Sequence, residues 1–162
     1  MSADTRKVFS RTSLGVGLLA AVAASLGAAH ETDPVARGRY VVLIGGCNDC
    51  HTAGYTEAGG KLPDKDWLTG SGVGWRGPWG TTYASNLRLY MQQLSEEQWV
   101  QTARSAQYRP PMPWWALHEM SEPDLRALYH FVRQLGAAGQ AMPAYVPAGQ
   151  VPKGPVVQFP SP

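Results

Sequence analysis

The most constraining feature of this sequence is the pentapeptide Cys47-Asn48-Asp49-Cys50-His51, which contains both cysteines of the 162-residue chain. Two cysteines three positions apart close too small a loop to stabilise a domain as a structural disulfide. A redox-active dithiol usually lies in a strand-helix-strand setting, and no such alternation surrounds this pair. A zinc site needs a second pair of Cys or His ligands at similar spacing, and none follows in the sequence.

The remaining interpretation is a C-x-x-C-H site, at which a heme is attached covalently. In such a site two thiols form thioethers with the porphyrin vinyl groups, and the adjacent histidine ligates the iron. Residues i and i+3 of a helical turn share one face, so Cys47 and Cys50 can both reach the edge of a macrocycle. We therefore expect one heme c, bound covalently through Cys47 and Cys50, with His51 as an iron ligand.

The sixth iron ligand decides what such a heme can do. A methionine sulfur gives a low-spin iron suited to electron transfer, whereas an open position permits gas binding or peroxide chemistry. Met112 stands between Pro111 and Pro113 in a proline-rich segment that opposes a helix and favours an extended loop. We predict Met112 as the sixth ligand, with Met91 as the main alternative. The remaining candidates have simpler interpretations as packing, helix or tail residues: Met120, Met142, His118 and His130.

Residues 1–29 have the pattern of an export signal. Arg6, Lys7 and Arg11 form a basic start, residues 14–26 are uncharged and apolar or small, and residues 27–29 offer small side chains for cleavage. The apolar run is much shorter than the roughly 20 residues that a bilayer-spanning helix needs. We predict cleavage near Ala29, a periplasmic protein, and no membrane span after cleavage.

Charge and composition exclude several other classes of protein. The chain is 44% hydrophobic, which is too apolar for a disordered protein. From residue 30 onward, basic and acidic residues are equal in number, and no long run of either sign occurs. A nucleic-acid or anionic-membrane surface is therefore not expected.

The helices that would surround the motif can be placed from local signals. Asp33-Pro34 is a typical helix start, and Gly45-Gly46 is a typical end, so we expect a helix over about Val35 to Ile44. The stretch Ser95 to Gln98 is a capping box that opens a second helix.

Ser121 to Asp124 opens the last helix, and Gly136 ends it. Residues 51–94 show no convincing strand pattern and are expected to form a loop. The predicted fold is therefore all-α, with three main helices and long loops wrapped around one heme.

The order of these features resembles the class I c-type cytochromes, close to the monoheme domains that accompany periplasmic dehydrogenases. The resemblance covers about residues 34–136. The most specific pieces are Arg37-Gly38-Arg39-Tyr40, Cys47 to His51, Gly80 to Asn86, Met112-Pro113 and Asp124 to Tyr129.

This resemblance implies a cytochrome c fold and several residue roles. The first and last helices are expected to cross closely, with Gly38 against Tyr129. A proline carbonyl often accepts the proton on Nδ1 of the heme-ligating histidine, and Pro63 is the candidate here. The donor groups expected for the heme propionates are chiefly Trp79 and Arg109. Other possible donors are Trp67, Trp75, Tyr83 and Asn86.

The expected function is electron transfer between exported redox proteins, with a dehydrogenase as donor and an oxidase or another cytochrome as acceptor. The protein itself would not be an enzyme. Two alternatives stay open: a heme subunit fixed to a dehydrogenase complex, and a ligand-binding or peroxidase-like heme protein with a labile sixth ligand.

The domain organisation follows from these assignments: an export signal (1–29), a monoheme domain (30–136) and a proline-rich tail (137–162). Six prolines lie in the last 27 residues. We expect the tail to be an extended segment, either draped over the domain or acting as a docking arm. Draping is favoured because Tyr145, Val156, Val157 and Phe159 would gain cover.

Overall fold

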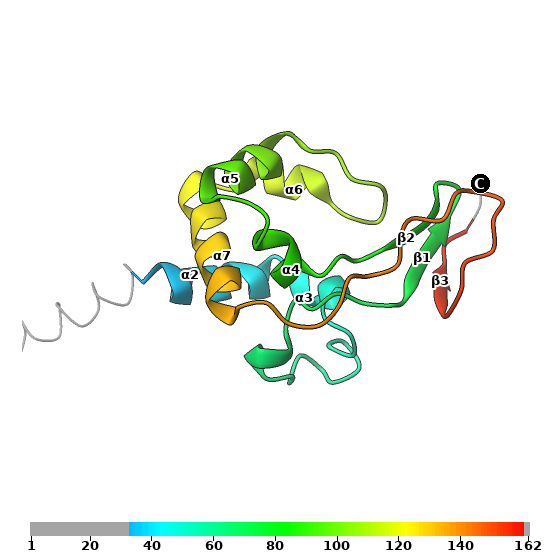
Figure 1. Cartoon of the computed structure of the whole chain (residues 1–162), viewed down its shortest axis with the longest axis horizontal. Helices are drawn as coiled ribbons and strands as arrows, with labels where there is room; N and C mark the ends of the chain where they lie inside the picture. Colours follow the sequence, from blue (N-terminus) through cyan, green and yellow to red (C-terminus); the bar gives the residue numbers. More distant parts are fainter. Residues whose placement is uncertain (1–32, 161–162) are drawn as a thin grey trace, which may run out of the picture. The chain divides into compact units, whose positions relative to one another are not determined.

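The computed structural model describes residues 33–160, and the predicted export signal lies outside this range. From Pro34 onward the chain forms one compact unit. Within the described range the helices are α2 (Pro34–Ile44), α3 (Cys47–His51), α4 (Leu87–Met91), α5 (Glu96–Ser105), α6 (Trp114–Glu119) and α7 (Glu122–Leu135). A 3-10 turn, η1, covers Asp64–Asp66, and the strands are β1 (Gly74–Gly77), β2 (Gly80–Tyr83) and β3 (Val156–Gln158). The fold is thus mostly helical, with a small sheet (Figure 1).

The sheet corrects the expectation of an all-α fold with a structureless segment over residues 51–94. Strand β1 pairs antiparallel with β2 and parallel with β3, giving the order β2-β1-β3. Each strand has only three or four residues, which is too short to show an alternating pattern. Strand β3, which pairs with β1, comes from the distant C-terminal tail, so no local sequence pattern predicts this pairing.

The predicted helix starts are confirmed at the two longer C-terminal helices. The hydroxyl of Ser95 accepts a hydrogen bond from the Gln98 N–H at 3.2 Å, and the Gln98 side chain accepts from the Ser95 N–H at 2.8 Å. This reciprocal pair is a capping box. Ser121 caps α7 in a similar position, accepting from the Asp124 N–H at 3.3 Å. Helix α7 ends before Gly136, which has a positive φ of 72°.

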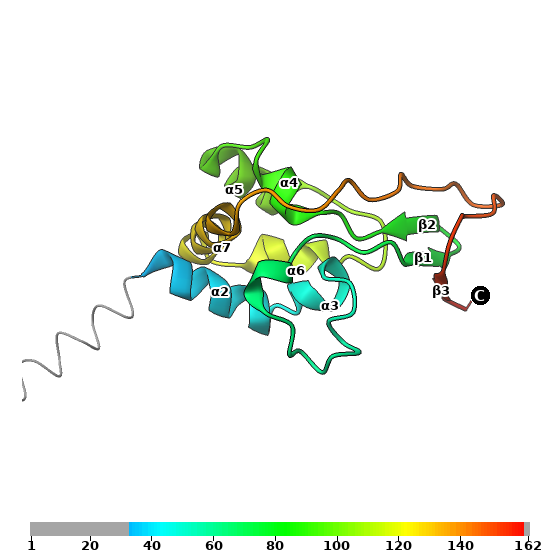
Figure 2. The same cartoon turned by 60° about the horizontal axis from the view of Figure 1, so that its bottom comes forward.

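Helices α2 and α7 cross at close range, as Figure 2 shows from a second side. A Cβ added at Gly38 would lie 2.0 Å from the Ala127 carbonyl oxygen and 2.7 Å from Cβ of Phe131. The aromatic partner of Gly38 is therefore Phe131 and not the expected Tyr129. Ala127 and Phe131 are four residues apart and share a helix face, whereas Tyr129 points elsewhere and donates to the Leu94 carbonyl at 2.9 Å.

One hydrophobic core links the helices to the loop that follows α3. Trp67 is almost fully buried and contacts Tyr55 and Phe131 edge to face. Most other buried hydrophobic residues come from α2, α5 and α7: Val41, Val42, Trp99, Val100, Ala103, Leu125, Leu128 and Val132. No helix within residues 33–160 is long and apolar enough to cross a bilayer.

The C-terminal tail leaves α7 and runs to the sheet, where it adds strand β3 (Figure 1). Phe159 packs against both Trp75 and Trp79, and the Tyr145 hydroxyl donates to the Trp79 carbonyl at 2.8 Å. The extended, draped course agrees with the expectation. However, Val156 and Val157 remain 37% and 42% exposed, so cover for these two side chains does not explain the path of the tail.

Candidate functional site

Both cysteines lie on the single turn of helix α3. Helix α2 ends at Ile44, and Gly46 then adopts a left-handed conformation (φ 64°) directly before Cys47. The positive φ suits glycine and separates the end of α2 from the start of α3. Cys47 and Cys50 are partly buried, and both thiols are free.

The local environment keeps the three reactive side chains of the motif neutral. Burial raises the pKa of Cys47 to about 11, and burial together with the nearby Asp49 carboxylate raises the pKa of Cys50. Burial also lowers the pKa of His51. At neutral pH the site therefore presents two thiols and an uncharged imidazole.

His51 is held in one orientation by a backbone carbonyl. Its Nδ1 lies 2.7 Å from the carbonyl oxygen of Ser85, which can only accept, so Nδ1 carries the proton. The unprotonated Nε2 is then the nitrogen with a lone pair for a ligand. The expected acceptor, Pro63, has another role: its carbonyl accepts from the Asp66 N–H at 2.9 Å and closes the turn η1.

Ser85 reaches His51 because three segments of chain lie side by side. The Gly70 N–H donates to the His51 carbonyl at 2.7 Å, and the Ser71 N–H donates to the Ala84 carbonyl at 3.1 Å. Residues 70 and 71 thereby connect the end of α3 to the stretch that contains Ser85. Sequence reasoning missed this acceptor, since it lies 34 residues from His51.

A local signal for the position of Ser85 does exist. The Asn86 side chain accepts from the Leu89 N–H at 3.0 Å and caps helix α4. Asparagine before the sequence Leu-Arg-Leu is a recognisable N-cap, and it fixes where the extended stretch ending at Ser85 must stop.

The buried side chain of Arg88 also holds helix α4 in place. Arg88 donates to the carbonyls of Lys65, Leu135 and Gly136. Two of these carbonyls lie at the C-terminal end of α7, where a cation is favoured by the helix dipole. Burial lowers the pKa of Arg88, and each of its three side-chain nitrogens donates to one of these carbonyls. This contact joins the end of α7 to the segment that supports His51.

Met112 lies on the loop over residues 106–113, between α5 and α6. The loop is without helix or strand, as its prolines predict, and it extends from the helices toward the strands (Figures 1 and 2). Met112 is half-buried and packs against the hydrophobic core, as Cys47 also does.

The other candidate ligands are held in different environments. Met91 is fully buried inside the core, and Met120 is partly buried against it. Met142 packs against Gly70, where an added Cβ would lie 2.5 Å from Cγ of Met142.

The two candidate histidines already have polar neighbours. Nε2 of His118 lies 3.0 Å from the Ala106 carbonyl oxygen. Nε2 of His130 lies 3.4 Å from a carboxylate oxygen of Glu96.

The two main expected propionate donors both lie next to Tyr145, and each already has a neighbour. The Trp79 indole N–H donates to the Trp75 carbonyl at 3.3 Å, and the Arg109 guanidinium lies 3.9 Å from the centre of the Tyr145 ring. In contrast, the indole N–H of Trp75 is buried and has no partner among the described residues. A buried unpaired donor is costly and suits an acceptor supplied by a bound group.

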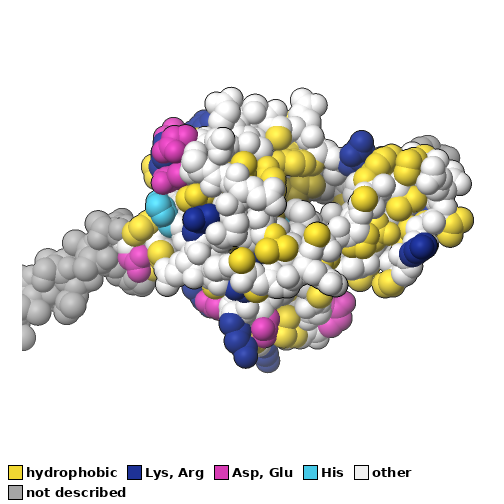
Figure 3. Space-filling view, in the orientation of Figure 1, with side chains coloured by type: hydrophobic (Ala, Val, Ile, Leu, Met, Phe, Trp, Pro, Cys, Tyr) yellow, Lys and Arg dark blue, Asp and Glu magenta, His cyan; other side chains and the backbone are white. Residues whose placement is uncertain are grey.

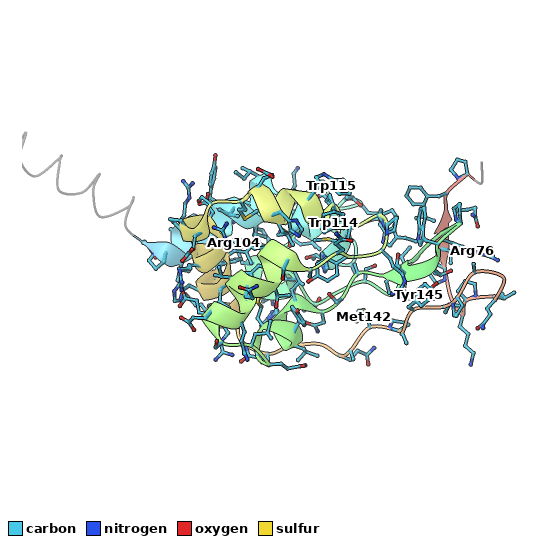
Figure 4. The ribbon with its side chains drawn as sticks, turned by 90° about the horizontal axis from the view of Figure 1, so that it is seen from above. Arg76, Arg104, Trp114, Trp115, Met142 and Tyr145 are labelled. Carbon is cyan, nitrogen blue, oxygen red and sulfur yellow. The ribbon has the colours of Figure 1, made fainter. Side chains whose placement is uncertain are left out.

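The molecular surface is hollowed between the helices and the sheet. Figure 3 shows hydrophobic side chains inside this hollow. Figure 4 shows Trp114 and Trp115 at the start of α6, on the other side of the molecule from Met142 and Tyr145 on the tail. Between the helices and the sheet, the described residues thus leave a space with apolar walls.

Comparisons with known proteins add no assignment: no protein family, curated protein or solved structure matches this chain. Within residues 33–160, no group of three or more His, Cys, Asp or Glu side chains is placed to hold a metal ion.

Proposed function

We propose that this protein is a periplasmic electron carrier of the class I c-type cytochrome kind, with one covalently bound heme c. The observation that carries the proposal is the arrangement on α3. Two free thiols are spaced i and i+3, and the next residue is a histidine whose Nδ1 is bound to the Ser85 carbonyl. This arrangement leaves Nε2 of His51 available to iron. A disulfide between the two cysteines would not need a histidine oriented in this way, and neither would a zinc site.

The residues present fit such a group. Cys47 and Cys50 would hold the heme covalently, and His51 and Met112 would ligate its iron. The hollow with apolar walls suits the macrocycle, and the orphaned indole N–H of Trp75 suits a propionate oxygen. Arg109 stays predicted as a further donor, because the edge of a stacked guanidinium keeps its N–H groups free. Trp79 also stays a prediction, and its indole N–H would have to leave the Trp75 carbonyl to serve.

A bound heme would supply a one-electron redox couple. The protein's part is to hold the ligands still while the charge changes. The Ser85 carbonyl keeps the His51 ring in one orientation, and contacts with the hydrophobic core restrain the Met112 side chain. Because little has to move, the iron can change its oxidation state at small cost. The electron donor would be an exported dehydrogenase, and the acceptor an oxidase or another cytochrome. No substrate is chemically changed in this exchange.

A second candidate is a heme subunit fixed to a dehydrogenase complex. The exposed Trp115, next to the Met112 loop, favours some contact with another protein, because it is 59% exposed. A third candidate, a ligand-binding or peroxidase-like protein, requires that Met112 does not ligate the iron.

Covalent attachment is tested by producing the protein with the heme-attachment machinery and extracting it with acidified organic solvent. We expect the heme to stay with the unmutated protein and to be lost from the double variant Cys47→Ala, Cys50→Ala. Each single variant keeps one thioether and should retain heme. Heme that extracts freely from the unmutated protein would rule out the attachment.

The carrier function is tested at Met112. We expect the ferric protein to be low-spin, with a weak near-infrared band from sulfur-to-iron charge transfer, and to bind peroxide slowly. The ferrous protein should bind carbon monoxide slowly. Met112→Ala should abolish the band, open the iron to added ligands and lower the potential.

Met91→Ala is the matched control and should do none of these things, because Met91 lies inside the core. A high-spin ferric protein would contradict the carrier function. Loss of the band in Met91→Ala alone would contradict only the assignment of Met112.

A further inference from the structure

The tip of the Met112 loop is fastened to the sheet and to the tail. The Thr82 hydroxyl on β2 donates to the Pro110 carbonyl at 2.7 Å. The neighbouring Arg109 places its guanidinium carbon 3.9 Å from the centre of the Tyr145 ring. Both contacts lie within three residues of Met112, and both partners belong to the part of the molecule across the hollow from the helices.

Tyr145 is itself fixed firmly to the hairpin formed by β1 and β2. Its hydroxyl donates to the Trp79 carbonyl at 2.8 Å, and its ring lies against Gly80, where an added Cβ would approach the ring to 2.8 Å. The next residue, Val146, exchanges two backbone hydrogen bonds with Thr81, at 2.8 and 3.0 Å. The position of the ring is therefore set by the hairpin and does not depend on the Met112 loop.

The Met112 side chain packs against the hydrophobic core, and the loop backbone is tied by short local bonds, among them the Trp114 N–H donating to the Met112 carbonyl at 2.9 Å. Within residues 106–113 the backbone makes a turn in which the Met112 N–H donates to the Arg109 carbonyl at 3.3 Å. This weak turn joins the stacked residue directly to Met112. A displacement of Arg109 would therefore move Met112 as well.

We propose that Tyr145 and Arg109 are positioning residues that clamp the Met112 loop, so that the C-terminal tail sets how firmly the sixth position is held. The inference rests on the proposed function. A guanidinium stacked on an aromatic face favours the closed loop, and losing the stack favours conformations in which Met112 is withdrawn. The tail then acts as part of the ligand site, although it carries none of the ligands.

The test uses the heme-loaded ferric protein and imidazole as a probe that competes with Met112 for the iron. We expect Tyr145→Leu to bind imidazole about tenfold more tightly than the unmutated protein, because the closed loop loses the stacking contact. Tyr145→Phe keeps the ring and should stay close to the unmutated affinity. Tyr40→Leu is the matched control, since Tyr40 is an exposed ring on α2 near the Arg37 guanidinium.

A second readout needs no heme reaction. Amide hydrogen exchange at Met112 should be faster in Tyr145→Leu than in Tyr145→Phe, while exchange in α7 stays unchanged. If Tyr145→Leu lost its fold, Arg109→Gln would remove the stack from the other side, with the same expected gain in imidazole affinity.

The measurements distinguish a failure of the clamp from a failure of the carrier function. Unchanged imidazole affinity in Tyr145→Leu, in a protein whose near-infrared band depends on Met112, overturns the clamp and leaves the carrier function standing. Absence of the band from the unmutated protein overturns the carrier function, and the clamp falls with it.

Discussion

Gly38 shows how much a single residue can fix in this fold. Its missing side chain lets α2 approach α7 so closely that an added Cβ would lie 2.0 Å from the Ala127 carbonyl oxygen. Backbone cannot yield as the end of a long side chain can. We expect Gly38→Ala to lower the free energy of unfolding by about 3 kcal/mol, measured by denaturant unfolding.

Gly72→Ala is the control for this substitution. An added Cβ there meets no atom within 4 Å, and Gly72 does not have a positive φ. Its unfolding free energy should change little or rise slightly, because alanine restricts the unfolded chain. Equal stability of the two variants would mean that α7 does not approach Gly38 of α2 closely enough to exclude a Cβ.

At the scale of elements, α2 and α7 are joined by an ion pair as well as by packing. Nε of Arg37 donates to a carboxylate oxygen of Asp124 at 2.7 Å, and this bond, followed by that from Ser121, holds the pKa of Asp124 below its usual value. A carboxyl with a lowered pKa stabilises the fold above its unfolded pKa of about 4, and this stabilisation is lost as the pH falls through the folded value.

We therefore expect Asp124→Asn to cost at most about 1 kcal/mol at pH 7, since the Arg37 side chain is half-exposed. The difference between variant and unmutated protein should shrink below about pH 4. Thermal unfolding at pH 7 and pH 3 measures it. Glu119→Gln is the control, because the Glu119 carboxylate forms no ion pair within residues 33–160. Its stability difference from the unmutated protein should be the same at both pH values. An equal stability difference for Asp124→Asn at pH 7 and pH 3 would contradict the role of the ion pair.

At the scale of the whole molecule, the balance of charge bears on the proposed electron exchange. After removal of the predicted export signal, basic and acidic residues are equal in number. A protein without net charge exerts little long-range steering, so rates of electron exchange should depend only mildly on salt. Oxidation of the reduced protein by hexacyanoferrate, followed from low to physiological ionic strength, checks this. A steep fall in rate would reveal a local basic patch at the site of exchange.

The sequence by itself determined the features that depend on neighbours a few residues apart. The caps at Ser95 and Ser121 and the stop at Gly136 are where the local pattern places them, because a cap hydrogen bond spans only three residues. The turn that carries Cys47 and Cys50 is also a local matter, since a spacing of three residues puts two thiols on one helical face.

Only the tertiary structure decided which distant groups meet these local elements. The acceptor for His51 is Ser85 and not Pro63, the neighbour of Gly38 is Phe131 and not Tyr129, and the tail supplies a third strand. Each partner is a backbone carbonyl, a side chain or a strand edge that many other residues could have offered. Long-range packing selects among such equivalent groups by bringing one of them into contact, and no periodicity along the chain records that choice.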